Sequence, residues 1–120
     1  MLINELSKRT GLSAHTIRFY EKSGLIKGHR LEAVKSNNYF HYDEETVDKL
    51  ELIGHAKAVG FTLSEIGELI DAWYDKKFTK QDKINILDAK LQSIDLKIKQ
   101  LEEMKLLIAE FKNDVLANDC

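Results

Sequence analysis

The residues best suited to binding chemistry are basic, and they gather near one end of the chain. Between Ser7 and Lys35, seven Lys or Arg face only two acidic residues, Glu21 and Glu32, so this segment carries +5. The whole chain carries −2, which leaves −7 for the remainder. A basic head on an acidic body is typical of a protein that presents one end to a polyanion. Composition alone leaves open the alternative of a chance fluctuation in a solvated surface. The seven basic residues are Lys8, Arg9, Arg18, Lys22, Lys27, Arg30 and Lys35.

Catalytic and metal-binding patterns are missing from the sequence. It has no glycine-rich phosphate loop and no nucleophile elbow, and its carboxylates alternate with lysines as on solvated helices. A single thiol, Cys120, is too few for a soft-metal site. We therefore expect no enzyme and no metal site. The lone cysteine also excludes an intrachain disulfide and agrees with a cytosolic protein. The histidines lie apart, without ligand spacing, at His15, His29, His41 and His55.

Two short helices are predicted to position the basic residues. The first covers residues 4–10 and ends at Gly11, which accepts a left-handed backbone without penalty. Ser13 is a good N-cap for a second helix over residues 14–22. Two short helices joined by a glycine-containing turn are typical of a helix-turn-helix, although many small helical proteins share this pattern.

A turn-rich stretch and two further helices follow. Residues 25–42 lack helical periodicity and end in Tyr39-Phe40-His41-Tyr42, which favours a strand, so we predict a small two-stranded wing. Asp43 is expected to cap a helix that ends near Gly60. Thr62 and Glu65 have the spacing of a capping box, which predicts a helix continuing to about residue 75.

The last predicted helix has an apolar stripe that its own domain is too small to cover. It begins after Thr79, and about 35 residues of helix would extend about 50 Å. Apolar residues recur three and four apart, with one slip of three residues. We expect a second copy to cover the stripe; the alternative is a helix lying along its own domain. The dimerisation residues would be Ile84, Leu87, Leu91, Ile94, Ile98, Leu101, Met104 and Ile108.

These elements predict a mostly helical, all-α protein in two parts. Residues 1–75 would form a DNA-binding domain, and residues 76–120 a dimerisation helix with a short tail. No apolar run approaches the ~20 residues that span a bilayer. The first residues have no basic segment followed by an apolar stretch, so no secretion signal is visible. A cytoplasmic location is expected.

Three motifs in order resemble the MerR family of bacterial regulators. Residues 12–26 (LSAHTIRFYEKSGLI) are similar to the recognition-helix stretch of that family, and residues 38–42 (NYFHY) to its wing motif. Residues 56–66 (AKAVGFTLSEI) match a third segment, and the neighbouring sequence looks nearest to the copper-responsive branch. The resemblance implies a winged helix-turn-helix with an antiparallel coiled-coil dimer. It also implies a homodimer that regulates transcription with RNA polymerase by distorting an overlong promoter spacer.

The same resemblance places residues 14–22 in the major groove. Arg18 offers a forked donor for a guanine edge or a phosphate, and Tyr20 a hydroxyl for a phosphate while its ring packs on the domain. Alternatives remain: Tyr39 and Tyr42 could be core aromatics, and Arg18 or His15 could be a solvated surface residue. Ile17 and Phe19 are assigned to packing, or in the case of Phe19 to a partly buried shoulder. The predicted DNA-binding residues are Ser13, His15, Thr16, Arg18, Tyr20, Arg30, Lys35, Tyr39 and Lys57.

Two departures from the family pattern lie in and before the wing, and a further one concerns the sensor. Phe40 replaces the usual wing arginine, and the linker from Ile26 to Tyr39 is slightly longer than usual. Metal-sensing relatives carry cysteines around the dimer helix, whereas residues 78–81 have none and Cys120 stands alone. No cofactor is evident, and an unidentified effector or a redox role for Cys120 stays open. A helical adaptor or nucleoid-type protein, binding a partner or DNA without sequence specificity, is the rival function.

Overall fold

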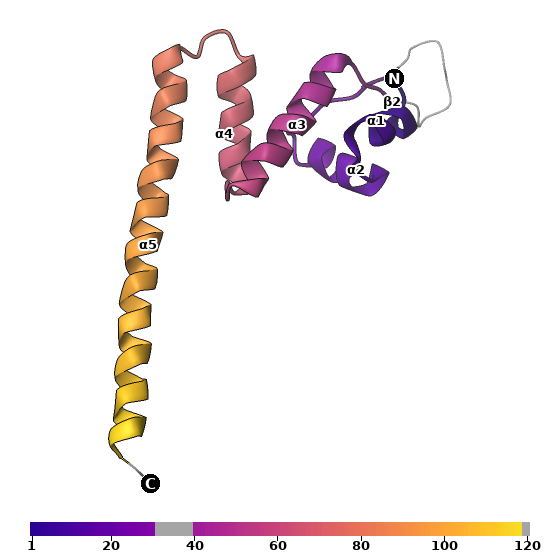
Figure 1. Ribbon diagram of the computed structural model, residues 1–120. Helices are drawn as coiled ribbons and strands as arrows, with labels where there is room; N and C mark the ends of the chain where they lie inside the picture. The colour runs from indigo at the N-terminus through magenta and orange to yellow at the C-terminus, as the bar shows by residue number, and fades with distance from the viewer. Residues whose placement is uncertain (31–39, 119–120) are drawn as a thin grey trace. The chain divides into compact units, whose positions relative to one another are not determined.

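The computed structural model describes residues 1–30 and 40–118, apart from the side chains of residues 29, 30 and 40. The chain divides into two compact units, Met1–Thr79 and Lys80–Cys120, which are described separately below. The first unit is called the head. It contains helices α1 (Ile3–Thr10), α2 (Ala14–Lys22), α3 (Glu44–Ala58) and α4 (Leu63–Tyr74) and strands β1 (His29–Arg30) and β2 (Phe40–His41), and the second unit contains helix α5 (Lys80–Ala117) (Figure 1).

Three helices of the head, α2, α3 and α4, begin at polar caps that the sequence predicted. Ser13 accepts a hydrogen bond from the amide of Thr16 (3.1 Å), which satisfies one of the free amides in the first turn of α2. At the start of α4 the capping box is complete: the amide of Glu65 donates to Thr62 Oγ1 (3.2 Å), and the amide of Thr62 donates to Glu65 Oε1 (2.8 Å). Local sequence thus sets where these helices start.

A left-handed glycine ends α1 and creates the turn into α2. Gly11 has φ 73°, and its amide donates to the carbonyl of Ser7 (2.9 Å). A residue with a Cβ would be strained in this conformation. The Ser7 hydroxyl donates to the carbonyl of Leu12 (2.5 Å), so a side chain of α1 also bonds across the turn. Helix α2 consequently starts only four residues after α1 ends.

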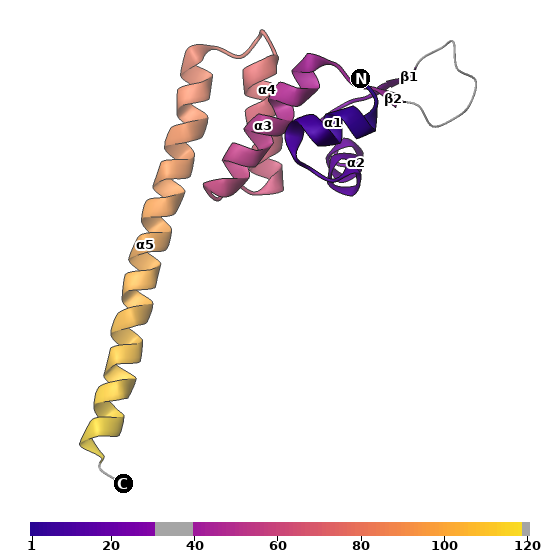
Figure 2. The same cartoon turned by 45° about the vertical axis from the view of Figure 1, so that its right-hand side comes forward.

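The core of the head lies among α1, α2, α3 and α4. Helix α1 packs against α2 and α3, and α3 packs against α4 (Figure 2). Burying an aliphatic side chain stabilises the fold by about 1.5–3 kcal/mol. The largest fully buried side chains come from α1, α2, α3, α4 and the residue after β2: Leu6, Ile17, Ile53, Ile66 and Tyr42.

The strands β1 and β2 pair antiparallel, with His29 opposite His41 and Arg30 opposite Phe40. They lie within the stretch that the sequence predicted to be a two-stranded wing. Met1 pairs with the residue after β2: its amino group donates to the carbonyl of Tyr42 (2.6 Å), and the Tyr42 amide donates to the carbonyl of Met1 (2.7 Å). These two hydrogen bonds attach the main chain of Tyr42 to the first residue of the head.

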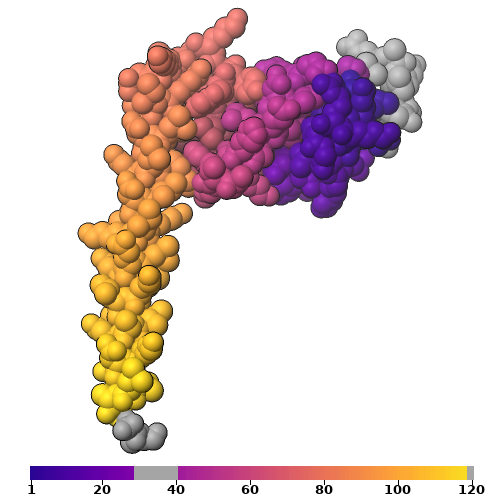
Figure 3. Space-filling view, viewed as in Figure 1, coloured from indigo at the N-terminus to yellow at the C-terminus, as the bar shows by residue number. Residues whose placement is uncertain are grey.

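The second unit is one helix. Helix α5 has 38 residues, and at 1.5 Å per residue it is about 57 Å long. Figure 3 draws it as a rod that runs from orange to yellow. Most apolar side chains along it are exposed, with values from 38% at Ile84 to 76% at Val115. The predicted helical fold with a long C-terminal helix is confirmed. No helix in the described part of the chain has the length and apolar character that crossing a bilayer requires.

Candidate nucleic-acid interface

Helix α2 has one buried side and one exposed side. Ile17 is fully buried and Tyr20 is 4% exposed, and both belong to the core. The exposed residues follow the spacing of a single helical stripe, at i, i+3, i+4 and i+7. We call this stripe the outer face of α2. It consists of His15, Arg18, Phe19 and Lys22.

The outer face carries two fixed positive charges. Among the described residues, neither Arg18 nor Lys22 has a side-chain hydrogen bond or ion pair. Burial of the opposite side therefore orients the helix and leaves its cationic groups directed to solvent. Such a face can donate hydrogen bonds to phosphates and to acceptor atoms on base edges.

Ser13 and Thr16 lie at the start of α2 and bond to each other. The Ser13 hydroxyl donates to Thr16 Oγ1 (2.9 Å) in addition to accepting from the Thr16 amide. This cap fixes the first turn of the helix, next to His15. Both residues were predicted to bind DNA; the structure assigns them a capping role, and DNA contact by either stays a prediction.

A hydrogen bond connects the exposed helix to the end of β2. The Tyr42 hydroxyl donates to Glu21 Oε1 (2.8 Å), and Tyr42 is only 2% exposed. Burial raises the pKa of Tyr42 above its ordinary value of 10.0, and the hydrogen bond to Glu21 raises it further, whereas the charge of Arg18 opposes the change. The open choice between core and DNA contact for Tyr42 is thereby decided in favour of the core.

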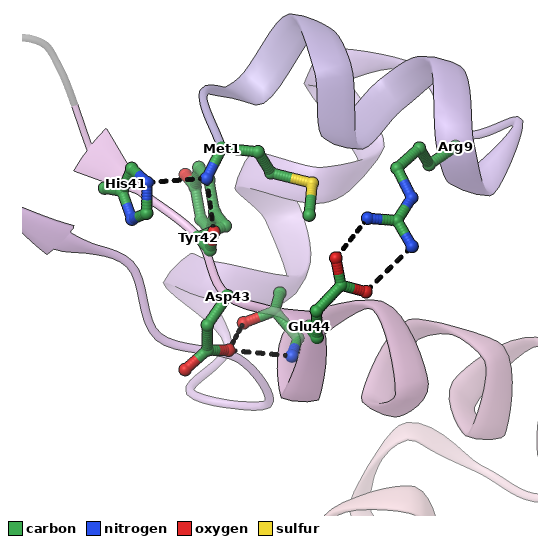
Figure 4. Close-up of polar contacts among 7 residues, drawn as sticks. Met1, Arg9, His41, Tyr42, Asp43 and Glu44 are labelled. Carbon is green, nitrogen blue, oxygen red and sulfur yellow. Dashed lines mark hydrogen bonds and ion pairs between the residues drawn. The ribbon is translucent and has the colours of Figure 1, made fainter.

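A second link joins α1 to α3 next to the strand pair. The guanidinium of Arg9 forms a bidentate ion pair with the Glu44 carboxylate, and the Arg9 Nη2 to Glu44 Oε2 distance is 2.7 Å (Figure 4). The hydrogen bond from Arg9 lowers the pKa of Glu44. Asp43, the N-cap of α3, accepts from both the amide and the hydroxyl of Thr46 (3.0 Å each). Arg9, counted among the basic residues of the head, is therefore paired with Glu44 at the surface.

The other predicted contact residues have different positions. Lys57 is exposed in the last turn of α3. Tyr20 packs in the core as predicted, and its phosphate contact stays a prediction. Arg30 is in β1, but its side chain lies outside the described residues, as do Lys35 and Tyr39. Phe19 was predicted either to pack in the core or to form a partly buried shoulder of the helix. It is 50% exposed, which agrees with the second alternative.

The sequence analysis did not identify the two long-range links or the place of Phe19 on the outer face of α2. Glu21 and Tyr42 are 21 residues apart, and Arg9 and Glu44 are 35 apart, so no local pattern pairs them. Phe19 could have been found, because it shares a helical stripe with His15, Arg18 and Lys22.

A groove in the head, between α3 and α4, does not favour a polyanion. It measures about 490 Å³, and its lining includes two lysines, Lys49 and Lys76, and two aspartates, Asp71 and Asp75. Lys49 Nζ lies 5.1 Å from the centre of the Tyr74 ring. In the part of the chain that the structure describes, no three His, Cys, Asp or Glu side chains are grouped as they would be to hold a metal ion.

The order of elements, the capped second helix and its exposed cationic face define a helix-turn-helix protein. The chain matches the model of the MerR HTH family of regulatory proteins over residues 1–73, and the MerR DNA-binding model over residues 47–111. It belongs to the MerR family and is a DNA-binding transcriptional regulator.

Individual relatives agree with this assignment. The chain is 34% identical over 119 residues to the HTH-type transcriptional regulator HmrR of Rhizobium leguminosarum bv. viciae, covering 99% of this chain and 89% of HmrR. It is 32% identical over 105 residues to the regulator CueR of Salmonella typhi, covering 88% and 74%. The crystal structure of the transcription regulator PbrR691 from Ralstonia metallidurans CH34, in complex with lead(II), superposes with a TM-score of 0.79 at 26% identity, covering 94% and 86%.

Proposed function

We propose that the chain binds promoter DNA as a homodimer, with the outer face of α2 in the major groove of each of two half-sites. The observation that carries this proposal is that face itself. Arg18 and Lys22 are exposed there, on a helix whose opposite side is anchored by Ile17 and Tyr20. In helix-turn-helix proteins the second helix enters the major groove, and residues toward its N-terminal end contact bases. Arg18 would bind a guanine edge, and Lys22 a phosphate.

The wing and α3 would add contacts to the DNA backbone. Lys57 is exposed on α3, and β1 and β2 form a strand pair next to α2 in the sequence. The bond from Tyr42 to Glu21 supports a fixed relation between α2 and the end of β2. Arg30, Lys35 and Tyr39 would contact phosphates from this wing, and Phe40 would leave the wing one charge short of the family pattern.

Dimerisation would use helix α5 as an antiparallel coiled coil. The predicted stripe is largely exposed, with Leu91, Leu101 and Ile108 at 59%, 60% and 66%. Ile94 is half-buried. Further exposed apolar side chains lie outside the predicted stripe, so a partner would cover a broader surface than two coiled-coil positions per heptad. These additional residues are Leu96, Leu106, Leu107 and Leu116.

The regulatory step would be distortion of the promoter. Two half-sites bound by a dimer allow the protein to bend and untwist the DNA between them, which costs a few kcal/mol. In the family this realigns promoter elements for RNA polymerase, and we extend that mechanism to this chain. An effector would act by shifting the dimer between two arrangements on the DNA.

Selection of bound duplexes from a randomised DNA pool tests the proposal. The purified protein is incubated with the pool at about physiological salt, and bound duplexes are amplified and sequenced. We expect an enriched motif with two-fold symmetry, and affinity for it that falls steeply as salt rises. Binding without enrichment would instead support a nucleoid-type protein, and absence of binding would support an adaptor for a protein partner.

A further inference from the structure

Phe19 places an apolar ring within an otherwise polar face. It is 50% exposed and lies on the outer face of α2 beside Arg18, with His15 and Lys22 one turn away on either side. Single exposed apolar side chains are common on protein surfaces. This one differs because of its position on the helix that the proposed function places in the major groove.

The ring of Phe19 lies against a buried ring, and its backbone is fixed by hydrogen bonds. Its centre lies 5.6 Å from that of Tyr20, at an interplanar angle of 57°, and Tyr20 is buried. The carbonyl of Phe19 accepts hydrogen bonds from the Ser23 amide (2.9 Å) and the Ser23 hydroxyl (2.8 Å) at the end of the helix. The exposed half of the ring therefore stands on a fixed backbone, with a buried ring on one side, and loses little freedom on binding.

The major groove offers one apolar group to such a ring. Guanine, adenine and cytosine present donors and acceptors there, and thymine adds its 5-methyl group. A phosphate is anionic and strongly hydrated, so covering it with a hydrocarbon ring costs part of its hydration. Covering the exposed ring by a methyl group removes apolar surface of both from water.

We propose that Phe19 contacts the 5-methyl group of one thymine in each half-site and is a specificity-determining residue for the operator. This inference rests on the proposed function, because it requires α2 to lie in the major groove. Arg18 and Phe19 are adjacent on the outer face, so a guanine bound by Arg18 would lie next to the thymine read by Phe19.

Replacing thymine by deoxyuridine tests the contact, since uracil pairs like thymine and lacks only the methyl group. Each thymine of the selected operator is replaced in turn, in one half-site or in both, and affinity is measured by fluorescence anisotropy. At one position per half-site, we expect wild-type affinity to fall about fourfold for one methyl group and about fifteenfold for both.

Substitutions at residue 19 test whether the loss of affinity without the methyl group depends on Phe19. Phe19→Ala should bind the thymine operator more weakly than wild type and should not distinguish thymine from uracil at that position. Phe19→Leu should retain part of the discrimination. Val59→Ala, which truncates another exposed apolar residue of the head, should retain all of it. Thermal unfolding of each variant checks that the fold is intact.

The possible outcomes are distinct. Failure to select any operator would reject the proposed function and this inference with it. A selected operator without enriched thymine, or with thymines whose methyl groups do not matter, would overturn the role of Phe19 alone. Equal methyl dependence in wild type and Phe19→Ala would assign the methyl contact to another residue and would also overturn it.

Discussion

The head and helix α5 differ in how far their apolar side chains are exposed to solvent. In the head, Leu6, Ile17 and Ile53 are all 0% exposed, since four short helices surround one core. In α5, residues of the same type such as Leu101 and Leu106 are 60% and 67% exposed. A helix of 38 residues with this much exposed apolar surface depends on burial against another surface for its stability. The difference is the one expected from the proposed dimer, in which the head buries its own apolar residues and α5 would bury its stripe against a second copy.

Breaking the partner contact of α5 should have the largest effect. Ile98→Asp combined with Leu101→Asp introduces two charges into the proposed dimer contact, where they would be buried unpaired. We expect the dimer to become a monomer in analytical ultracentrifugation, with helical circular dichroism reduced and the head still folded. A control that adds two acids at exposed polar positions of the same helix, Gln92→Asp with Gln100→Asp, should remain a dimer. A dimer in the first variant would mean that α5 is not the pairing helix.

A cavity in the head core should destabilise the protein without a partner being involved. Leu6→Ala removes a fully buried side chain of α1, and we expect a loss of about 2–5 kcal/mol in the free energy of unfolding. The matched change on α5, Leu106→Ala in the monomeric double variant, should alter stability by less than about 0.5 kcal/mol. Urea denaturation measures both. Comparable losses at the two sites would contradict the contrast between the units.

Within the head, substitutions in the core should affect stability, whereas substitutions on the outer face of α2 should affect DNA binding. Arg18 is exposed, so Arg18→Ala should leave the unfolding free energy nearly unchanged. Affinity for the selected operator should fall by about 1–3 kcal/mol for each half-site, because a bidentate base contact is lost. Lys22→Ala should weaken binding to all sequences alike and reduce its salt dependence. Wild-type affinity in Arg18→Ala would reject the proposed recognition helix.

The smallest expected effect concerns the bond between the buried Tyr42 and Glu21. Tyr42→Phe removes it and should cost about 0.5–1.5 kcal/mol of stability near neutral pH. The folded-state pKa of Tyr42 lies above its unfolded value of 10.0, so the protonated hydroxyl stabilises the fold below about pH 10. This contribution is lost as the pH rises above that value.

Measuring the unfolding free energy at increasing alkaline pH tests whether stability falls in this way. The difference in stability between wild type and Tyr42→Phe should shrink, and then reverse, as the pH rises above about 10. Glu21→Gln keeps an acceptor oxygen and should retain more stability than Glu21→Leu. A difference independent of pH up to 11 would show that the Tyr42 hydroxyl is not held as described.

Local chemistry made the helix boundaries predictable. Ser13, Asp43 and Thr62 were identified as caps because short polar side chains satisfy free amides a few residues away, and each has this role in the structure. Gly11 and Gly60 were placed at helix ends for the same local reason, and both have positive φ. The spacing of apolar residues likewise predicted the long helix α5.

Contacts between distant residues could not be predicted in the same way. Whether Tyr42 belongs to the core or to the DNA surface depends on α2 passing close to it, which no pattern around residue 42 reveals. Arg9 was counted only toward the positive charge of its segment, because its partner Glu44 lies on another helix. On α5 the sequence indicates which residues are apolar, but Leu96 and Leu107 show that exposure extends beyond the expected stripe.

In the proposed complex, two chains joined through α5 bind one operator through two heads. Native mass spectrometry of the protein with the selected operator duplex measures this directly. We predict two chains per duplex, and loss of that complex in the variant with Ile98→Asp and Leu101→Asp. One chain per duplex, or two chains that bind independently and equally well in that variant, would contradict the claim.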